Sequence, residues 1–410
     1  MIPRLRIPLV LTTLLCASCL CAADWPQWRG PNRDGKSLDT GLLKKWPAGG
    51  PKLLWHVQGI GRGYSSVAVA QATVYTTGLI EDQLVISAFD MNGKTKWRVP
   101  HGPGWTEEHP GSRATPTIDE GRLYLLSGPG LLACYNARTG ERAWSIDLPE
   151  TFQSQPGKWG YAESVLIHKN LAIVTPGRPN CIVALDKRNG RTVWRSRGVH
   201  DPAAYSSCIA FTHQGVDMIV NLTAHGLVCV GADDGQFLWR NDRAAALPAG
   251  CPTPVYSDGY VFAASGYGNG GVCLRLSVAG RSVRATQVWE TREMDCHHGG
   301  FVIVDGCIYG NHGRGWNCLD LHTGRQRWFA RGVGKGSICY ADGMLYTYSE
   351  IGGRIALVAA SPKGFSEVSN FAVQGRGQSF AHPVVAGGTL YLRYDDNLYA
   401  YDVRGPAFPH

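Results

Sequence analysis

Along most of the chain, one short pattern of hydrophobic and polar positions recurs. A stretch of alternating apolar residues leads into a polar turn that ends in Gly, and a Trp follows that Gly by four residues. Asp or Asn opens most of these turns, where its side chain bonds its own backbone, and Gly supplies a positive φ. Each copy therefore predicts a β-hairpin with a large aromatic residue on its second strand. The clearest copies end in Gly93/Trp97, Gly140/Trp144, Gly190/Trp194, Gly235/Trp239 and Gly324/Trp328.

Repetition at a fixed period predicts a ring or an array of similar units, and spacings of about 40–50 residues suit four-stranded propeller blades. Helical repeats are disfavoured, because the chain lacks a 3.6-residue hydrophobic period. An eighth unit, from about 380 to 405, lacks its Trp strand, and the isolated strand Pro51–Val57 fits that vacancy. We therefore predict an all-β, eight-bladed β-propeller of four-stranded blades, its ring closed by an N-terminal strand that joins the last blade. The seven full units span 63–99, 112–147, 161–197, 205–241, 251–291, 298–330 and 335–373.

The chain divides into three expected parts. Residues 1–23 predict a signal peptide cleaved near Ala23, because basic residues precede a short apolar core and a small-residue site. That core is shorter than the roughly 20 residues of a membrane span, and a lipoprotein signal at Cys19 is the less favoured alternative. Residues 24–50 form a Pro/Gly-rich lead-in, and residues 51–410 form the propeller. We expect a periplasmic or secreted protein with no transmembrane segment.

Composition agrees with a large β protein. The 410 residues include 52 Gly and 13 Trp but only 5 Met, which favours turns and aromatic-rich strands over helix bundles. The formal net charge of +8 is spread along the repeats without a Lys/Arg run. A solvated surface is therefore expected, and nucleic acid is not expected as a partner. We expect a monomer.

Ten of the 13 cysteines remain once the three in residues 1–23 are set aside. Cys134, Cys229 and Cys318 each lie six residues before a repeat Gly, so they hold one equivalent position in separate units. Such positions are not expected to come within the Cα separation of about 4.4–6.8 Å that a disulfide needs. Buried thiols that pack as small apolar side chains are expected instead. Cys251 and Cys296, in corresponding loops of neighbouring units, are the one candidate pair.

Candidate chemistry gathers where the chain enters the inner strand of each unit. In a propeller these loops meet on one face around the axis, so they form one rim. Positions filled only for turn geometry would tend toward Gly, Ser or Thr, whereas this rim collects charged and aromatic residues. They are Tyr64, Arg113, Glu163, Tyr205, His298, Lys335 and His382, with Trp159, Asp295 and His297 in nearby loops.

The adjacent pair His297 and His298 is the sharpest local signal, because neighbouring imidazoles suit proton transfer or metal ligation. A structural role for the pair is the alternative, and Glu163 and Lys335 could simply pair across the rim. Beyond residues 1–23, the sequence contains no HExxH, P-loop, CxxC pair or GxSxG pattern, so it lacks the signals of metalloproteases, P-loop enzymes and serine hydrolases.

The repeat Ala-Leu-Asp-x-x-x-Gly-x-x-x-Trp at residues 184–194 resembles the pyrroloquinoline-quinone (PQQ) repeat of eight-bladed quinoprotein dehydrogenases. It is also similar to the repeat of the BamB-type scaffold lipoprotein of outer-membrane-protein assembly. Further stretches resemble a group of exported bacterial PQQ-binding-like propellers, and the resemblance covers nearly all of the mature chain. These stretches are 25–31 (WPQWRGP), 159–161 (WGY), 201–207 (DPAAYSS), 297–300 (HHGG) and 332–337 (GVGKGS).

The quinoprotein resemblance implies PQQ and Ca²⁺ as cofactors. Lys335 and Arg113 would hold the quinone carboxylates, with Tyr205 and Trp159 beside the cofactor. Glu163 would be the metal ligand, and the other calcium ligands cannot be assigned.

The same resemblance implies catalytic residues for alcohol oxidation. His298, assisted by His297, or else Asp295, would take the substrate hydroxyl proton. The chain departs from the family in having no adjacent cysteines to stack on the quinone, and no Cys-x-x-Cys-His, so no haem is expected.

Two functions stay open from the sequence. One is a PQQ-dependent alcohol dehydrogenase-type oxidoreductase. The other is a non-catalytic scaffold that uses the same rim to bind a protein or a polysaccharide in the cell envelope. A shared fold does not decide between them, because function depends on the site.

Overall fold

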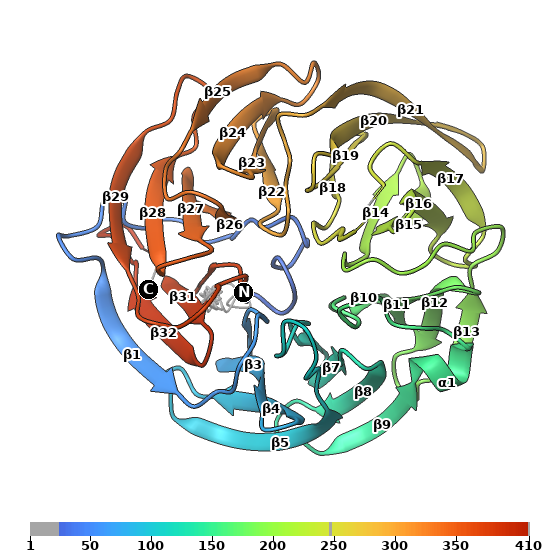
Figure 1. Cartoon of the computed structure of the whole chain (residues 1–410), viewed down its shortest axis with the longest axis horizontal. Helices are drawn as coiled ribbons and strands as arrows, with labels where there is room; N and C mark the ends of the chain where they lie inside the picture. The colour runs from blue at the N-terminus through green and yellow to red at the C-terminus, as the bar shows by residue number, and fades with distance from the viewer. Residues whose placement is uncertain (1–23, 246–247, 409–410) are drawn as a thin grey trace, which may run out of the picture.

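The computed structural model describes residues 24–245 and 248–408, and it contains eight four-stranded antiparallel sheets arranged in a ring (Figure 1). The predicted eight-bladed all-β propeller is thereby confirmed. The helix α1 (Leu148–Phe152) links the second and third blades. Within the residues described, no helix has the length and apolar character to cross a membrane. The predicted signal peptide lies outside the described residues.

Seven blades are built from four consecutive strands each, with the first strand nearest the axis and the fourth at the outside (Figure 1). The first four blades consist of β2 (Ala68–Ala70), β3 (Thr73–Ile80), β4 (Gln83–Phe89) and β5 (Thr95–Pro103); β6 (Thr117–Asp119), β7 (Arg122–Leu126), β8 (Leu131–Asn136) and β9 (Arg142–Asp147); β10 (Leu166–His168), β11 (Leu171–Gly177), β12 (Cys181–Asp186) and β13 (Thr192–Arg195); and β14 (Ile209–His213), β15 (Val216–Thr223), β16 (Gly226–Gly231) and β17 (Phe237–Asn241). The next three consist of β18 (Val255–Ser257), β19 (Tyr260–Ser265), β20 (Gly270–Ala279) and β21 (Ser282–Thr291); β22 (Phe301–Val304), β23 (Cys307–His312), β24 (Gly315–Asp320) and β25 (Gln326–Ala330); and β26 (Gly336–Ala341), β27 (Met344–Ser349), β28 (Arg354–Ala359) and β29 (Glu367–Ala372).

The eighth blade joins the two ends of the chain. Its inner three strands are β30 (Val384–Ala386), β31 (Thr389–Tyr394) and β32 (Asn397–Asp402), and its outer strand is β1 (Lys52–Gln58). β1 pairs antiparallel with β32 along its whole length. The predicted closure by the N-terminal strand is confirmed, and β1 covers the outer edge that β32 would otherwise expose.

The repeat Gly also allows a Trp of the preceding blade to pack closely against its turn. Gly190 has a φ of 75°, and a Cβ added there would lie 2.8 Å from the ring of Trp144 in the preceding blade. The Trp144 indole also donates a hydrogen bond of 3.2 Å to the Lys187 carbonyl in the same turn. Each such Trp therefore packs its blade against the turn of the next blade. The same packing joins Trp55 to Gly93, Trp97 to Gly140, Trp194 to Gly235 and Trp289 to Gly324.

Cysteines of the repeats lie opposite these tryptophans. Cys134 pairs in register with Trp144, Cys229 with Trp239, and Cys318 with Trp328. All three thiols are fully buried, as the sequence predicts, and fill the space beneath the indoles. Every cysteine in the described part of the chain is a free thiol, and this includes the candidate pair Cys251 and Cys296.

The lead-in crosses the ring on the face opposite the rim. It bonds to the far ends of inner strands, through bridges from Trp25 to Val69 and from Lys36 to Tyr340. Trp46 then packs edge-on against Phe371, with 5.2 Å between ring centroids. The lead-in is therefore part of the folded propeller, and it closes the central channel from one side.

Candidate functional site

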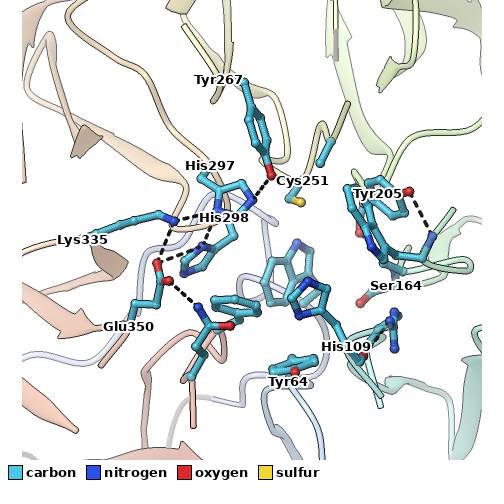
Figure 2. A pocket seen from close by; sticks show the side chains of 18 residues that line it. Tyr64, His109, Ser164, Tyr205, Cys251, Tyr267, His297, His298, Lys335 and Glu350 are labelled. Carbon is cyan, nitrogen blue, oxygen red and sulfur yellow. Dashed lines mark hydrogen bonds and ion pairs between the residues drawn. The ribbon is translucent and has the colours of Figure 1, made fainter. Parts of the chain in front are cut away.

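A cavity of about 340 Å³ lies on the axis of the ring (Figure 2). Every blade contributes to it through the loop before its inner strand, so it occupies the rim that the sequence predicts. A volume of this size falls in the range of small-molecule sites. Aromatic side chains make up much of its wall, namely Trp28, Tyr64, Trp159, Tyr205, Tyr267 and Phe380.

Seven of the ten residues that the sequence places at the rim line this cavity: Tyr64, Arg113, Trp159, Tyr205, His297, His298 and Lys335. The other three, Asp295, Glu163 and His382, do not belong to the lining. Asp295 accepts a hydrogen bond of 2.8 Å from the Gly268 amide, which holds its carboxylate on the turn between β19 and β20. Position alone does not establish a chemical role, so the assigned roles stay predictions.

Glu163 is buried between the third and fourth blades. Its carboxylate accepts hydrogen bonds from the Thr175 amide at 2.6 Å, the Thr175 hydroxyl at 3.2 Å and the Cys208 amide at 3.2 Å. Burial raises the pKa of this carboxyl, and the hydrogen bonds from Cys208 and Thr175 oppose that rise. Its oxygens therefore join two blades, and they face away from the cavity in which a metal ligand was expected.

One wall of the cavity carries a connected polar network (Figure 2). The Lys335 ammonium lies 2.8 Å from His297 Nδ1 and 2.8 Å from Glu350 Oε2. The contact with Glu350 is an ion pair. Gln378 donates to Glu350 Oε1 at 3.0 Å, and His297 Nε2 lies 3.0 Å from the Tyr267 hydroxyl. Because an ammonium can only donate, His297 Nδ1 is the acceptor.

His298 lies beside this network. Its Nδ1 is 3.4 Å from His297 Nδ1 and 3.9 Å from Glu350 Oε2. Burial lowers the pKa of His298 well below its ordinary value, and the neighbouring His297 and Lys335 lower it further. Burial and the Lys335 charge lower the pKa of His297 to about 4. Both imidazoles are therefore uncharged at neutral pH, the state in which they can accept a proton or ligate a metal.

The opposite wall carries Arg113 and an aromatic pair. The guanidinium donates to the carbonyls of Gly111 and His109 at 2.8 and 2.9 Å. Burial lowers the pKa of Arg113 to about 10, so the group still carries its positive charge at neutral pH. Trp159 and Tyr205 pack beside it with 5.6 Å between ring centroids. This wall thus offers two aromatic rings, tilted by 48° to each other, near a cation.

The lead-in supplies the floor of the cavity. Trp28 lines it and donates from Nε1 to the Thr253 hydroxyl at 2.9 Å. Arg29 and Arg33, which follow, are 2% exposed and donate to backbone carbonyls, Arg33 to Ser164 at 2.7 Å. Neither guanidinium forms an ion pair with a carboxylate of the described residues. These two buried guanidiniums therefore place positive charge under the cavity.

Sequence reasoning missed Trp28, Glu350 and Gln378. Trp28 lies in the lead-in, which has no repeat to align. Glu350 follows β27 and Gln378 precedes β30, so they reach the axis from loops on the predicted face but outside the inner-strand register. An acidic residue directly after the second strand of a blade was the available signal for Glu350.

The residues present fit one of the two implied cofactors. Aromatic walls with Arg113 and Lys335 suit a planar carboxylate-bearing quinone. Ca²⁺ takes six to eight oxygen ligands, whereas the described lining offers one carboxylate, Glu350, and that group is paired with Lys335. Glu163 binds backbone amides instead. Ca²⁺ therefore does not fit this cavity.

Fold and cavity together define the protein as an eight-bladed β-propeller with a ligand-sized pocket on its axis. The chain belongs to the family described as outer membrane protein assembly factor BamB, whose PQQ-repeat model matches residues 81–330. This match confirms the resemblance predicted from the repeat. No curated protein matches the sequence.

Several solved structures share the fold. BamB from Moraxella catarrhalis is 14% identical, with a TM-score of 0.61 over 86% of this chain and 99% of that one. Quinohemoprotein alcohol dehydrogenase from Comamonas testosteroni is 12% identical, with a TM-score of 0.66 over 95% of this chain and 82% of that one. A europium-containing methanol dehydrogenase is 10% identical, with a TM-score of 0.54 over 91% and 90% of the two chains. At these identities the likeness establishes the fold, which occurs in both BamB and quinoprotein dehydrogenases.

Proposed function

We propose that the axial cavity binds a planar, anionic aromatic molecule, with PQQ as the candidate that the repeat family offers. The observation that carries this proposal is the pairing of aromatic walls with an excess of positive over negative charge. Arg113 lies on one wall, Lys335 on the other, and Arg29 and Arg33 under the floor, while Glu350 is the one carboxylate of the described lining. A low-dielectric pocket with this balance of charge favours anions.

Each group of the cavity has a role in this proposal. Arg113 and Lys335 would pair with ligand carboxylates, and Trp159 and Tyr205 would pack on the rings. A bound quinone would supply an acceptor for the hydride of an alcohol. His298 would take the hydroxyl proton, because its imidazole is uncharged at neutral pH and lines the cavity. Since Ca²⁺ does not fit, no step is assigned to it, and binding is expected without added Ca²⁺.

A fluorescence titration tests ligand binding. PQQ added to the purified protein in the presence of a calcium chelator is expected to quench tryptophan emission saturably, because Trp28 and Trp159 line the cavity. Arg113→Ala and Lys335→Met should each weaken binding about tenfold, the loss of about one charge-assisted contact. Arg188→Ala, at an exposed turn of the third blade, is the matched control. Absence of saturable quenching at tens of micromolar PQQ would refute the proposal. Dye-coupled alcohol oxidation by the loaded protein then separates catalysis from binding.

A second candidate function is a non-catalytic scaffold for a protein or a polysaccharide of the cell envelope. The BamB family match over residues 81–330 favours it. Ile351 is 66% exposed beside the cavity-lining Glu350, so this candidate places a partner over the rim. A photocrosslinking residue at Ile351 should then give a discrete adduct in cells, whereas one at Val193, 54% exposed on an outer strand, should not. Equal labelling at both positions would count against a scaffold that uses the rim.

A further inference from the structure

We propose that His297, His298 and Glu350 form a site for a divalent first-row transition-metal ion at the wall of the axial cavity. This inference does not require the quinone, although His298 and Lys335 also have roles in the proposed function. The three residues come from two neighbouring blades. His297 and His298 precede β22, and Glu350 follows β27 (Figure 2).

The spacing of the donor atoms carries the first step. One ligand atom from each residue lies within 4.8 Å of the others. Two ligand atoms that are each about 2.1 Å from a metal ion lie about 3.0–3.4 Å apart at right-angle or tetrahedral coordination. The two Nδ1 atoms are 3.4 Å apart, and His298 Nδ1 is 3.9 Å from Glu350 Oε2. The remaining separation, between His297 and Glu350, is at most 4.8 Å, so side-chain shifts of up to about 1 Å would complete the coordination.

The donor types carry the second step. Two imidazoles and one carboxylate are typical of sites for Zn²⁺, Fe²⁺ and neighbouring ions, and they differ from the oxygen-only shell that Ca²⁺ prefers. Three protein ligands would leave the remaining coordination positions open toward the cavity. Glu350 and His298 are only 6% and 9% exposed, and Gln378 donates to Glu350 Oε1 at 3.0 Å, so the surrounding packing restricts both side chains.

The position of Lys335 carries the third step. Its ammonium lies 2.8 Å from both His297 Nδ1 and Glu350 Oε2, so a cation already occupies the space between two of the donors. The Lys335 side chain is 30% exposed and flexible, and it can turn into the open cavity when an ion enters. Lysine and metal are thus expected to compete for one position.

This competition gives opposite expectations for two kinds of variant. Protein stripped with a chelator and free of quinone is titrated with Co²⁺, followed by its visible absorption, and with Zn²⁺ by calorimetry. Wild type should bind about one ion per chain with a Kd below about 10 µM. His297→Ala and Glu350→Gln should weaken binding at least about tenfold, and Lys335→Met should strengthen it about tenfold. His322→Ala, at an exposed turn, controls for histidine loss elsewhere.

Several results would overturn the inference. Wild type that binds neither ion at about 100 µM, or His297→Ala that binds like wild type, rules the site out. Weaker binding in Lys335→Met would show that the lysine does not compete for the position. Thermal melting of each variant separates loss of ligands from loss of fold, and Glu350→Gln gives a second reading if His297→Ala unfolds. The PQQ titration of Lys335→Met has the opposite expected sign, so failure of one proposal is distinct from failure of the other.

Discussion

Arg393 is the residue whose removal should most directly weaken the closure of the ring. It lies on β31 of the last blade, is 2% exposed, and donates across the seam to the first blade. Its Nη2 donates to the Gly61 carbonyl at 2.8 Å, and its Nη1 donates to the Ser65 carbonyl at 3.2 Å and to the Thr77 carbonyl. Burial lowers the pKa of Arg393 to about 10, so it is a cation at neutral pH. We expect Arg393→Met to destabilise the closed ring.

The magnitude follows from the carbonyls that lose a donor. The Thr77 carbonyl keeps hydrogen bonds from the hydroxyls of Ser65 and Ser112, so it is not orphaned. The carbonyls of Gly61 and Ser65 lose the guanidinium, at about 1–3 kcal/mol for each buried group left unpaired. Methionine has a similar length, so it adds little cavity cost. Together these effects predict a loss of about 2–6 kcal/mol in the free energy of unfolding.

Denaturation followed by tryptophan fluorescence measures this loss. Arg393→Lys keeps the charge but cannot reach several carbonyls, so its loss should be intermediate. Arg284→Met, on an exposed position of the outer strand β21, is the matched control and should fall within about 0.5 kcal/mol of wild type. Limited proteolysis should find the new sensitivity near β1. An Arg393→Met protein as stable as the control would refute the reasoning.

Two further predictions concern the blade contacts and the effect of acid. Gly190→Ala should lower the free energy of unfolding by at least about 2 kcal/mol in the same denaturation experiment, because a φ of 75° is strained for Ala and the new Cβ meets the Trp144 ring. An unchanged denaturation midpoint would show that the contact between the two blades tolerates the added methyl group. Burial lowers the pKa of His101 from 6.5 to about 4. The unfolded chain therefore binds a proton at this residue at higher pH than the folded protein does. The free energy of unfolding should fall by about 3 kcal/mol from this residue as the pH drops from about 6.5 to 4. His101→Gln should lose that share of the pH dependence, and a full wild-type slope in the variant would contradict it.

The fold could be predicted because each repeat carries its own turn chemistry. Gly190 and its equivalents indicated the hairpins, and the vacancy in the eighth unit indicated the closure by β1. The contact between Gly190 and Trp144 could not be read, because it joins two different blades and depends on how they pack. No single copy of the repeat therefore indicated the contact between its Gly and the Trp of the preceding blade.

The site could be predicted only as far as backbone register reaches. Aligning the inner strands places Arg113, His298 and Lys335 at one cavity, since their loops share one face. The same register also places Glu163 on the rim, but its carboxylate lies between the third and fourth blades, where it accepts hydrogen bonds from the amides of Thr175 and Cys208. Register fixes where a loop lies and leaves open which way each side chain points. Trp28 could not be aligned with any position of the repeat, because the lead-in lies outside it.

The shared last blade has a consequence for how the chain folds. β1 is among the first segments of the propeller to be synthesised and β32 is among the last, and the contact between His56 and Asn397 spans 341 positions of the chain. Such a distant pairing forms late, because a large loop must close before the contact is made. The seven other blades can form from consecutive strands while this seam stays open. A circular permutant that begins within a turn between blades and links 408 to 24 should keep the ring while it shortens the sequence separation of that seam, and it should therefore fold faster than the natural order of strands.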